Sequence, residues 1–178
     1  LGPHHLNECF FDHVWAGPDE VLGPVGQGWK VIRRTLAYER VGVARYARCD
    51  RLLGLVGREL EGAWDSLAPA LRARWSRALI KVRVARLLAY RCVAAQARGE
   101  PSDALASVAR VAVTHGDQEV AETLFQVFGH QSLAGARSDA PLHGALEDHW
   151  RYAQASTVAS GTIEIQRSLI ARSVLGPS

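Results

Sequence analysis

Long amphipathic stretches constrain this chain more than any other feature of its sequence. From Gly28 onward, apolar residues recur every three or four positions, which is the period of a helix with one face turned toward a core. Several such stretches follow one another with mostly short connections, and this pattern favours an antiparallel bundle of the four-helix type. The sequence therefore predicts a mainly α-helical domain over residues 26–178.

The expected helices have recognisable start and stop signals, because proline favours the first helical turn and glycine the position just past the last one. One unbroken helix is expected over about 29–60, a second over 69–99 and a third over 101–129. A loop rich in glycine, serine and proline then leads to a short helix over about 146–155. The last helix is expected to begin at Gly161-Thr162.

Residues 1–25 differ from the rest of the chain. The apolar and aromatic run from Cys9 to Trp15 is bounded by proline and glycine, which is typical of a strand followed by a loop. A lone strand has unpaired edges, so we interpret this segment as the tail of a β-domain whose other strands are missing. The chain contains no methionine, and we expect it to be a fragment or a trimmed chain.

Composition excludes several classes of function. The 21 basic and 18 acidic residues give a net charge of +3, and the basic ones are scattered, so no nucleic-acid partner is expected. No apolar run reaches the roughly 18 residues that span a bilayer. The 3 cysteines lie far apart, which argues against a disulfide framework and suggests the cytoplasm. The histidines show no ligand-pair spacing, so no metal site is expected.

Glu39 is the charged residue whose position most needs an explanation. It falls on the apolar stripe of the first expected helix, between Leu36 and Val43. A carboxylate on a face that points to the core must be paired, ligand-bound or protonated. A desolvated glutamate suits the role of general base toward a weakly acidic carbon. The alternative is that Glu39 lies at the edge of the stripe and pairs with Arg40, Arg45 or another arginine.

Two further stretches could bind a ligand. Ser160 and Gly161 precede a helix N-terminus, where free backbone N–H groups and the helix dipole favour an anion such as a dinucleotide pyrophosphate. An ordinary N-cap at Thr162 is the alternative. Gln126 lies shortly before Gly129, which a left-handed helix C-cap explains completely; the same cap does not explain the glutamine.

Taken together, these motifs resemble the acyl-CoA dehydrogenase family. Residues 6–14 are similar to the last strand of its middle β-domain, and residues 26–29 and 36–40 resemble the entry and the middle of the first helix of its C-terminal domain. Residues 126–129 resemble its flavin-contacting turn, and residues 161–167 are similar to its C-terminal signature. The resemblance covers nearly the whole chain and implies the family's C-terminal helical bundle, preceded by the tail of the β-domain.

The resemblance also implies a reaction. Family members bind FAD and oxidise acyl-CoA thioesters: a glutamate removes a proton from the carbon alpha to the thioester while a hydride leaves the beta carbon for the flavin. That glutamate occupies one of two positions that reach the same point in space. The position before the Gly-Thr of the signature is Ser160 in this chain, which cannot act as a base. The position on the first helix is Glu39, which the resemblance therefore assigns as the general base.

The resemblance assigns roles to further residues and partners. It places Arg40 and Gly161 beside the substrate. It implies oligomers arranged as a dimer of dimers, homomeric or heteromeric, a function in fatty-acid and lipid metabolism, and electron-transfer flavoprotein as electron acceptor. The residues that it implies as FAD contacts, the first four of them toward a neighbouring subunit, are Gln126, Val127, Phe128, Gly129, Thr162 and Glu164.

Two departures from the family pattern leave alternatives open. His130-Gln131-Ser132 stands where the family usually continues with Gly-Asn-Gly, and residues 58–69 lack the customary Arg-x-x-Phe-Gly loop. The chain could therefore be a partner subunit with an incomplete flavin site in a heteromeric dehydrogenase. It could also be a helical oligomerisation module without activity. An isolated fragment is expected to be inactive, because most of the acyl pocket would lie outside it.

Overall fold

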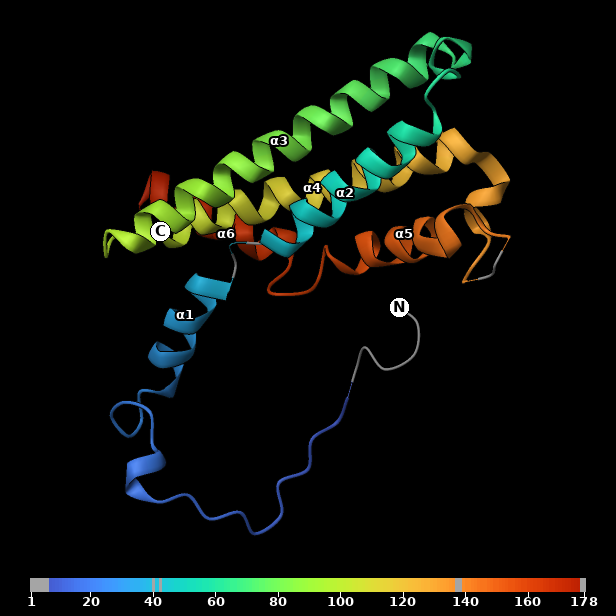
Figure 1. Ribbon diagram of the computed structural model, residues 1–178. Coiled ribbons are helices and arrows are strands. Elements are labelled where there is room, and N and C mark those ends of the chain that lie inside the picture. The colour runs from blue at the N-terminus through green and yellow to red at the C-terminus, as the bar shows by residue number, and fades with distance from the viewer. Residues whose placement is uncertain (1–6, 40, 42, 137–138, 177–178) are drawn as a thin grey trace.

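The computed structural model describes residues 7–39, 41, 43–136 and 139–176. Within these residues the regular structure is helical, and its elements form an elongated bundle (Figure 1). This confirms the predicted fold class. The α-helices are α1 (Gly28–Glu39), α2 (Val43–Glu59), α3 (Pro69–Ala97), α4 (Asp103–Phe128), α5 (Ala145–Ala155) and α6 (Ile163–Leu175). Short 3-10 turns lie at Pro18–Glu20, Trp64–Ser66, Gly129–Leu133 and Pro141–Gly144.

The two longest helices end where their sequence signals predict. Pro69 begins α3, where its missing N–H costs no hydrogen bond. The Ser102 side chain caps α4 by accepting a 3.2 Å hydrogen bond from the backbone N–H of Leu105. Gly129 follows α4 with a φ of 56°, a backbone conformation that glycine adopts at little cost. The boundaries predicted for α3 and α4 are confirmed.

Helix α4 lies at the centre of the bundle, with α2, α3, α5 and α6 packed around it. Alanine side chains lie between α3 and α4, among them Ala78, Ala85 and Ala109, and let the two backbones approach closely. One end of the core is an apolar cluster from α2, α3, α4 and α5: Cys49, Leu52, Leu53, Val56, Trp75, Ala78, Val82, Val120, Leu124 and Leu146. A second cluster continues it: Val41, Tyr46, Ala85, Ala89, Cys92, Ala109 and Val113.

The single helix predicted over 29–60 is wrong, because α1 ends at Glu39 and α2 begins at Val43. The sequence carries Gly42 at this point, and glycine weakens a helix. The break lets α2 pack along α3 and α4 while α1 leaves the bundle at an angle (Figure 1). As a result the apolar stripe of α1 is not a core face: the side chain of Ile32 is 52% exposed.

The strand predicted over Cys9 to Trp15 is not formed. Residues 7–16 run extended and exposed away from the bundle (Figure 1), and the described residues contain no strand that could pair with them. A strand needs a hydrogen-bonded neighbour, and the extended run is also interrupted at His13, where φ is 50°. Within the described parts of the chain, no helix has the length and apolar character needed to cross a membrane.

Candidate functional site

Glu39 meets the start of the last helix. It is the final residue of α1, and its Oε1 accepts a 2.9 Å hydrogen bond from the hydroxyl of Ser160. The expectation that Glu39 points into the core is wrong, because its side chain is exposed. Of the two arginines weighed as partners, Arg45 lies over the ring of Tyr152, 5.8 Å from its centroid. Arg40 lies outside the described residues.

The loop before α6 holds an unusual backbone. Ser160 has a φ of 58° and Gly161 a φ of 87°, so two consecutive residues adopt the left-handed region. Thr162 then caps α6, because its Oγ1 accepts a 3.3 Å hydrogen bond from the backbone N–H of Ile165. The predicted start of the last helix and its N-cap are confirmed. This geometry turns the Ser160 hydroxyl toward α1.

An open groove runs from this loop between α1 and α6. It has a volume of about 470 Å³. An ion pair between Arg33 and Asp103, 3.4 Å apart, joins α1 to α4 within it. A neighbouring hollow of about 640 Å³ shares Arg33 and adds Lys30 and Arg34. The groove is lined by Trp29, Arg33, Leu36, Asp103, Ser160, Gly161, Ile165, Leu169 and Arg172.

The groove combines three kinds of surface. Leu36 and Leu169 offer apolar contacts, and the cations of α1 offer partners for anionic groups. Glu39 lies beside it, held by Ser160 at the mouth. An exposed carboxylate next to an apolar groove with a basic end can accept a proton from an elongated, partly anionic ligand.

Glu164 makes the first turn of α6 less suited to an anion. The pKa of this exposed carboxyl is lowered, first by a hydrogen bond from its own backbone N–H and then by one from Thr162. A carboxylate therefore already occupies the positive end of the helix. Thr162 and Glu164 act as capping residues here, and their role toward a cofactor stays a prediction.

The four residues at the end of α4 lie far from Glu39. Val41, two residues after Glu39, shares a core cluster with Val113 of α4, and Gln126 lies 13 positions beyond Val113, which is about 20 Å along a helix that rises ~1.5 Å per residue. Val127 and Phe128 are half-buried and pack against the core cluster, whereas Gln126 and Gly129 are exposed. Apart from Gly129 itself, its chain neighbours and the adjoining helix backbone, no atom of the described residues lies within 4 Å of the point where a Cβ on Gly129 would sit. One chain therefore does not bring this turn and Glu39 together.

Sequence reasoning missed a buried polar cluster between α2, α4 and α5. The thiol of Cys49 lies 3.1 Å from Oδ1 of Asp117 and 3.9 Å from Nε2 of His149. Burial raises the pKa of Asp117 to about 6, although hydrogen bonding and nearby arginines act against it. Burial also lowers the pKa of His149 to about 4 and raises that of the Cys49 thiol. A thiol held protonated in this way is a poor nucleophile.

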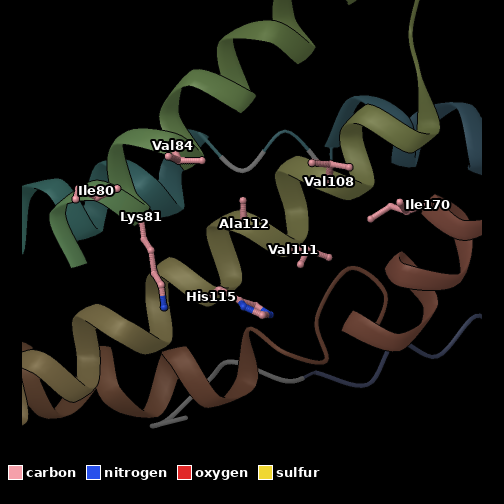
Figure 2. Close-up of a pocket in the computed structure, with 8 residues that line it drawn as sticks. All are labelled: Ile80, Lys81, Val84, Val108, Val111, Ala112, His115 and Ile170. Carbon is pink, nitrogen blue, oxygen red and sulfur yellow. The ribbon is translucent and has the colours of Figure 1, made fainter. Parts of the chain in front are cut away.

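A separate apolar hollow opens on the other side of α4, between α3 and α6 (Figure 2). It has a volume of about 320 Å³ and is lined by Ile80, Val84, Val108 and Ile170 among others. Its polar members are Lys81 and His115, and the pKa of His115 is lowered by burial and by the charges of Arg167 and Lys81. The hollow offers apolar contact area and no carboxylate.

The arrangement of these helices is that of a helical-bundle domain. The family model described as "Acyl-CoA dehydrogenase, C-terminal domain" matches residues 26–175. The chain belongs to the acyl-CoA dehydrogenase family. It is 29% identical to acyl-CoA dehydrogenase IpdE1 of Mycobacterium tuberculosis, a match that covers 98% of this chain and 45% of IpdE1. It is 25% identical to the human mitochondrial short-chain specific acyl-CoA dehydrogenase, over 93% of this chain and 40% of that protein.

Solved structures agree with this assignment. The Tcur3481-Tcur3483 steroid ACAD superposes with a TM-score of 0.83 at 27% identity, over 95% of this chain and 44% of that one. The ChsE4-ChsE5 complex from Mycobacterium tuberculosis gives a TM-score of 0.69 at 26% identity, over 85% of this chain and 41% of that one. The chain spans less than half the length of these relatives.

Proposed function

We propose that this chain is the C-terminal domain of an FAD-dependent acyl-CoA dehydrogenase in which Glu39 is the general base. The observation that carries the proposal is the 2.9 Å hydrogen bond between Ser160 and Glu39. The family resemblance places the catalytic glutamate at one of these two positions, and in this chain only Glu39 carries a carboxylate. A function in fatty-acid or other lipid metabolism belongs to the same proposal.

In this proposal the two carboxylate oxygens of Glu39 have different roles. Its Oε1 is engaged by the Ser160 hydroxyl, so Oε2 stays available to accept the proton from the carbon alpha to a thioester. In this proposal the acyl part lies in the groove beside Glu39, against Leu36 and Leu169, with Gly161 at the mouth of the groove. The cations of α1 suit the anionic part of acyl-CoA. We assign Arg40 to the same substrate on the resemblance alone.

The residues at the end of α4 fit FAD in part. Gln126 is exposed and Gly129 leaves open space, so both can contact a cofactor bound mainly by a neighbouring subunit. Val127 and Phe128 serve the core of their own chain. When bound, FAD supplies the acceptor for the hydride that leaves the beta carbon. We propose electron-transfer flavoprotein as the next electron acceptor.

The distance between Glu39 and Gln126 favours an oligomer, because a flavin site built from both needs two chains. A heteromeric assembly is the second candidate. Its support is that one structural relative is named as the ChsE4-ChsE5 complex, and that His130-Gln131-Ser132 replaces the family's usual glycine-rich continuation. In that case this chain supplies some site elements and a partner chain supplies the others. A purely structural helical module is the remaining alternative.

The decisive experiment uses the full-length protein that contains this chain. Glu39→Gln keeps the size and the hydrogen bond from Ser160 but removes the base, so turnover of acyl-CoA should fall about 1,000-fold with flavin content unchanged. Glu59→Gln is the matched control, because Glu59 is an exposed glutamate that ends α2 as Glu39 ends α1. Undiminished turnover in Glu39→Gln would refute the role. Fewer flavins than chains would support the heteromeric form.

A further inference from the structure

The hydroxyl that hydrogen-bonds to Glu39 belongs to Ser160, whose backbone conformation needs support from other residues. Ser160 adopts a φ of 58° without being glycine, and Gly161 follows with a φ of 87°. Side-chain-bearing residues rarely adopt this region, and they remain there only when surrounding contacts impose it. The contacts that impose it here come from two buried polar side chains on α4 and α6.

Gln166 of α6 supports the loop that contains Ser160 and Gly161. Its side chain is fully buried, and its Nε2 donates a 3.2 Å hydrogen bond to the carbonyl of Ser160. A Cβ on Gly161 would lie 2.7 Å from the same Nε2 atom. Only a residue without a side chain therefore fits between Ser160 and α6 while Gln166 keeps this bond.

Arg110 anchors the other side of the loop. It lies on α4 with 2% of its surface exposed, and its guanidinium donates to the carbonyls of Ser156, at 2.7 Å, and of Ala159. A further bond of 3.0 Å reaches Oγ1 of Thr114. These carbonyls follow the end of α5, where a cation also meets the negative end of the helix dipole. The anchor ends one residue before Ser160.

We propose that Gln166 and Arg110 are positioning residues that hold Ser160 in the conformation from which its hydroxyl orients Glu39. This inference rests on the proposed function for its catalytic consequence. The two residues act through Ser160, so they touch neither the substrate nor the reacting atoms. Nη2 of Arg110 donates to both carbonyls while Nη1 donates to Thr114, so a lysine, which has a single side-chain nitrogen, cannot make all of these bonds.

A double-mutant cycle in the full-length protein tests the proposal. Gln166→Met keeps the volume and removes the hydrogen bond, and we expect kcat to fall about tenfold with KM unchanged, because a misplaced base costs rate without costing binding. Ser160→Ala should lower kcat similarly. Gln166→Met should then have no further effect in the Ser160→Ala background. Additive effects, or a change in KM alone, would overturn the inference.

A second pair of variants distinguishes a specific effect on the loop from a general loss of folding. Gly161→Ala places a methyl group against Gln166 and should lower kcat about tenfold. Gly176→Ala is the matched control: it has a φ of 84° and no atom within 4 Å of the added methyl group. Both substitutions add a methyl group to a glycine with a positive φ, so equal effects on kcat would contradict a specific role of the loop. Arg110→Lys should act in the same direction as Gln166→Met.

Amide hydrogen exchange distinguishes a failure of the inference about the loop from a failure of the proposed function. The backbone N–H of Ile163 donates to the carbonyl of Thr157 across the loop, at 3.2 Å, and reports whether the loop is held. Gln166→Met should speed its exchange about tenfold. Faster exchange of the Ile163 N–H in Gln166→Met would show that Gln166 holds the loop. If, in addition, Glu39→Gln leaves turnover intact, the loop is held as proposed and the proposed function is wrong. Unchanged exchange would overturn the inference itself.

Discussion

The hydroxyl of Ser160 lies 2.9 Å from Oε1 of Glu39, although the two residues are 121 positions apart in the chain. One ends α1, and the other lies directly before the Gly-Thr that begins α6. These are the two positions at which the family resemblance places a catalytic glutamate. Their hydrogen bond supports the proposal that a carboxylate carried by either position reaches the same point.

This relationship predicts that the base can be moved. In the full-length protein, Glu39→Gln should lower turnover about 1,000-fold, and adding Ser160→Glu should raise it again by at least about tenfold, because the new carboxylate reaches the vacated point. Steady-state turnover with an acyl-CoA substrate measures both changes. Ser168→Glu in the same background is the control, since Ser168 is an exposed serine on α6. Equal recovery in both double variants would argue against a defined position of the base.

The buried cluster makes stability depend on pH in two opposing ways. The folded pKa of Asp117, about 6, lies above its ordinary 3.8 because of burial, so the folded state holds more protons between these values and stability falls as pH rises. The folded pKa of His149, about 4, lies below its ordinary 6.5, so stability rises with pH over a similar range. The two contributions largely cancel.

The substitution Asp117→Asn should separate the contributions of Asp117 and His149 to the pH dependence of stability. Asparagine keeps the shape and the contact with Cys49 but does not titrate, so the variant should gain stability relative to the unchanged chain as pH rises from 4 to 6. The gain should reach ~3 kcal/mol, the equivalent of about two pKa units. Urea unfolding at several pH values measures it. Asp65→Asn, at an exposed turn position, should show no such trend. A gain independent of pH would contradict the assignment.

Helix positions were largely predictable from the sequence because their signals are local. Pro69, Ser102, Gly129 and Thr162 act within one helical turn of themselves, and each begins or ends a helix as predicted. The break between α1 and α2 was missed. A glycine inside a periodic apolar pattern lowers helix stability without necessarily ending the helix, and only packing against α3 and α4 decides the outcome.

The site was predictable in position but not in environment. Periodicity identified the apolar side of α1 and placed Glu39 on it, yet periodicity does not state what covers that side. In the described residues nothing buries it, so Ile32 is exposed and Glu39 keeps contact with solvent. The contact between the end of α1 and the loop before α6 was instead predicted from two separated motifs that resemble those of a family. Periodicity carries no information about such a contact.

The buried polar residues were missed for a different reason. Arg110 and Asp117 lie seven positions apart on α4, on the same face as Val113 and Val120. This spacing is a signal that two charges share the core side of a helix. Their partners come from α2, α5 and the loop before α6, so no local pattern indicates which groups compensate them.

Core packing around α4 gives a direct stability test. Leu124 is 1% exposed and belongs to the apolar cluster that joins four helices. Leu124→Ala should lower the free energy of unfolding by about 3 kcal/mol, through lost burial and the cavity left behind. Leu133→Ala, at a residue that is 68% exposed, should change it by less than about 0.5 kcal/mol. Urea unfolding distinguishes the two. Equal losses would place Leu124 outside the core.

The outer face of α3 predicts self-association. Ile80 and Leu87 lie seven positions apart on one side of α3, and their side chains are 61% and 62% exposed. Ile80 also lines the hollow of Figure 2. Contiguous apolar surface of this kind favours contact with another chain. We expect the chain to sediment as an oligomer, and the double substitution Ile80→Glu with Leu87→Glu to shift it toward monomer, because two charges would be buried unpaired. Ser76→Glu, at an exposed polar position of the same helix, should leave the mass unchanged. A stable monomer of the unsubstituted chain would contradict the prediction, and dissociation by Ser76→Glu as well would mean that charge alone, not this apolar face, controls association.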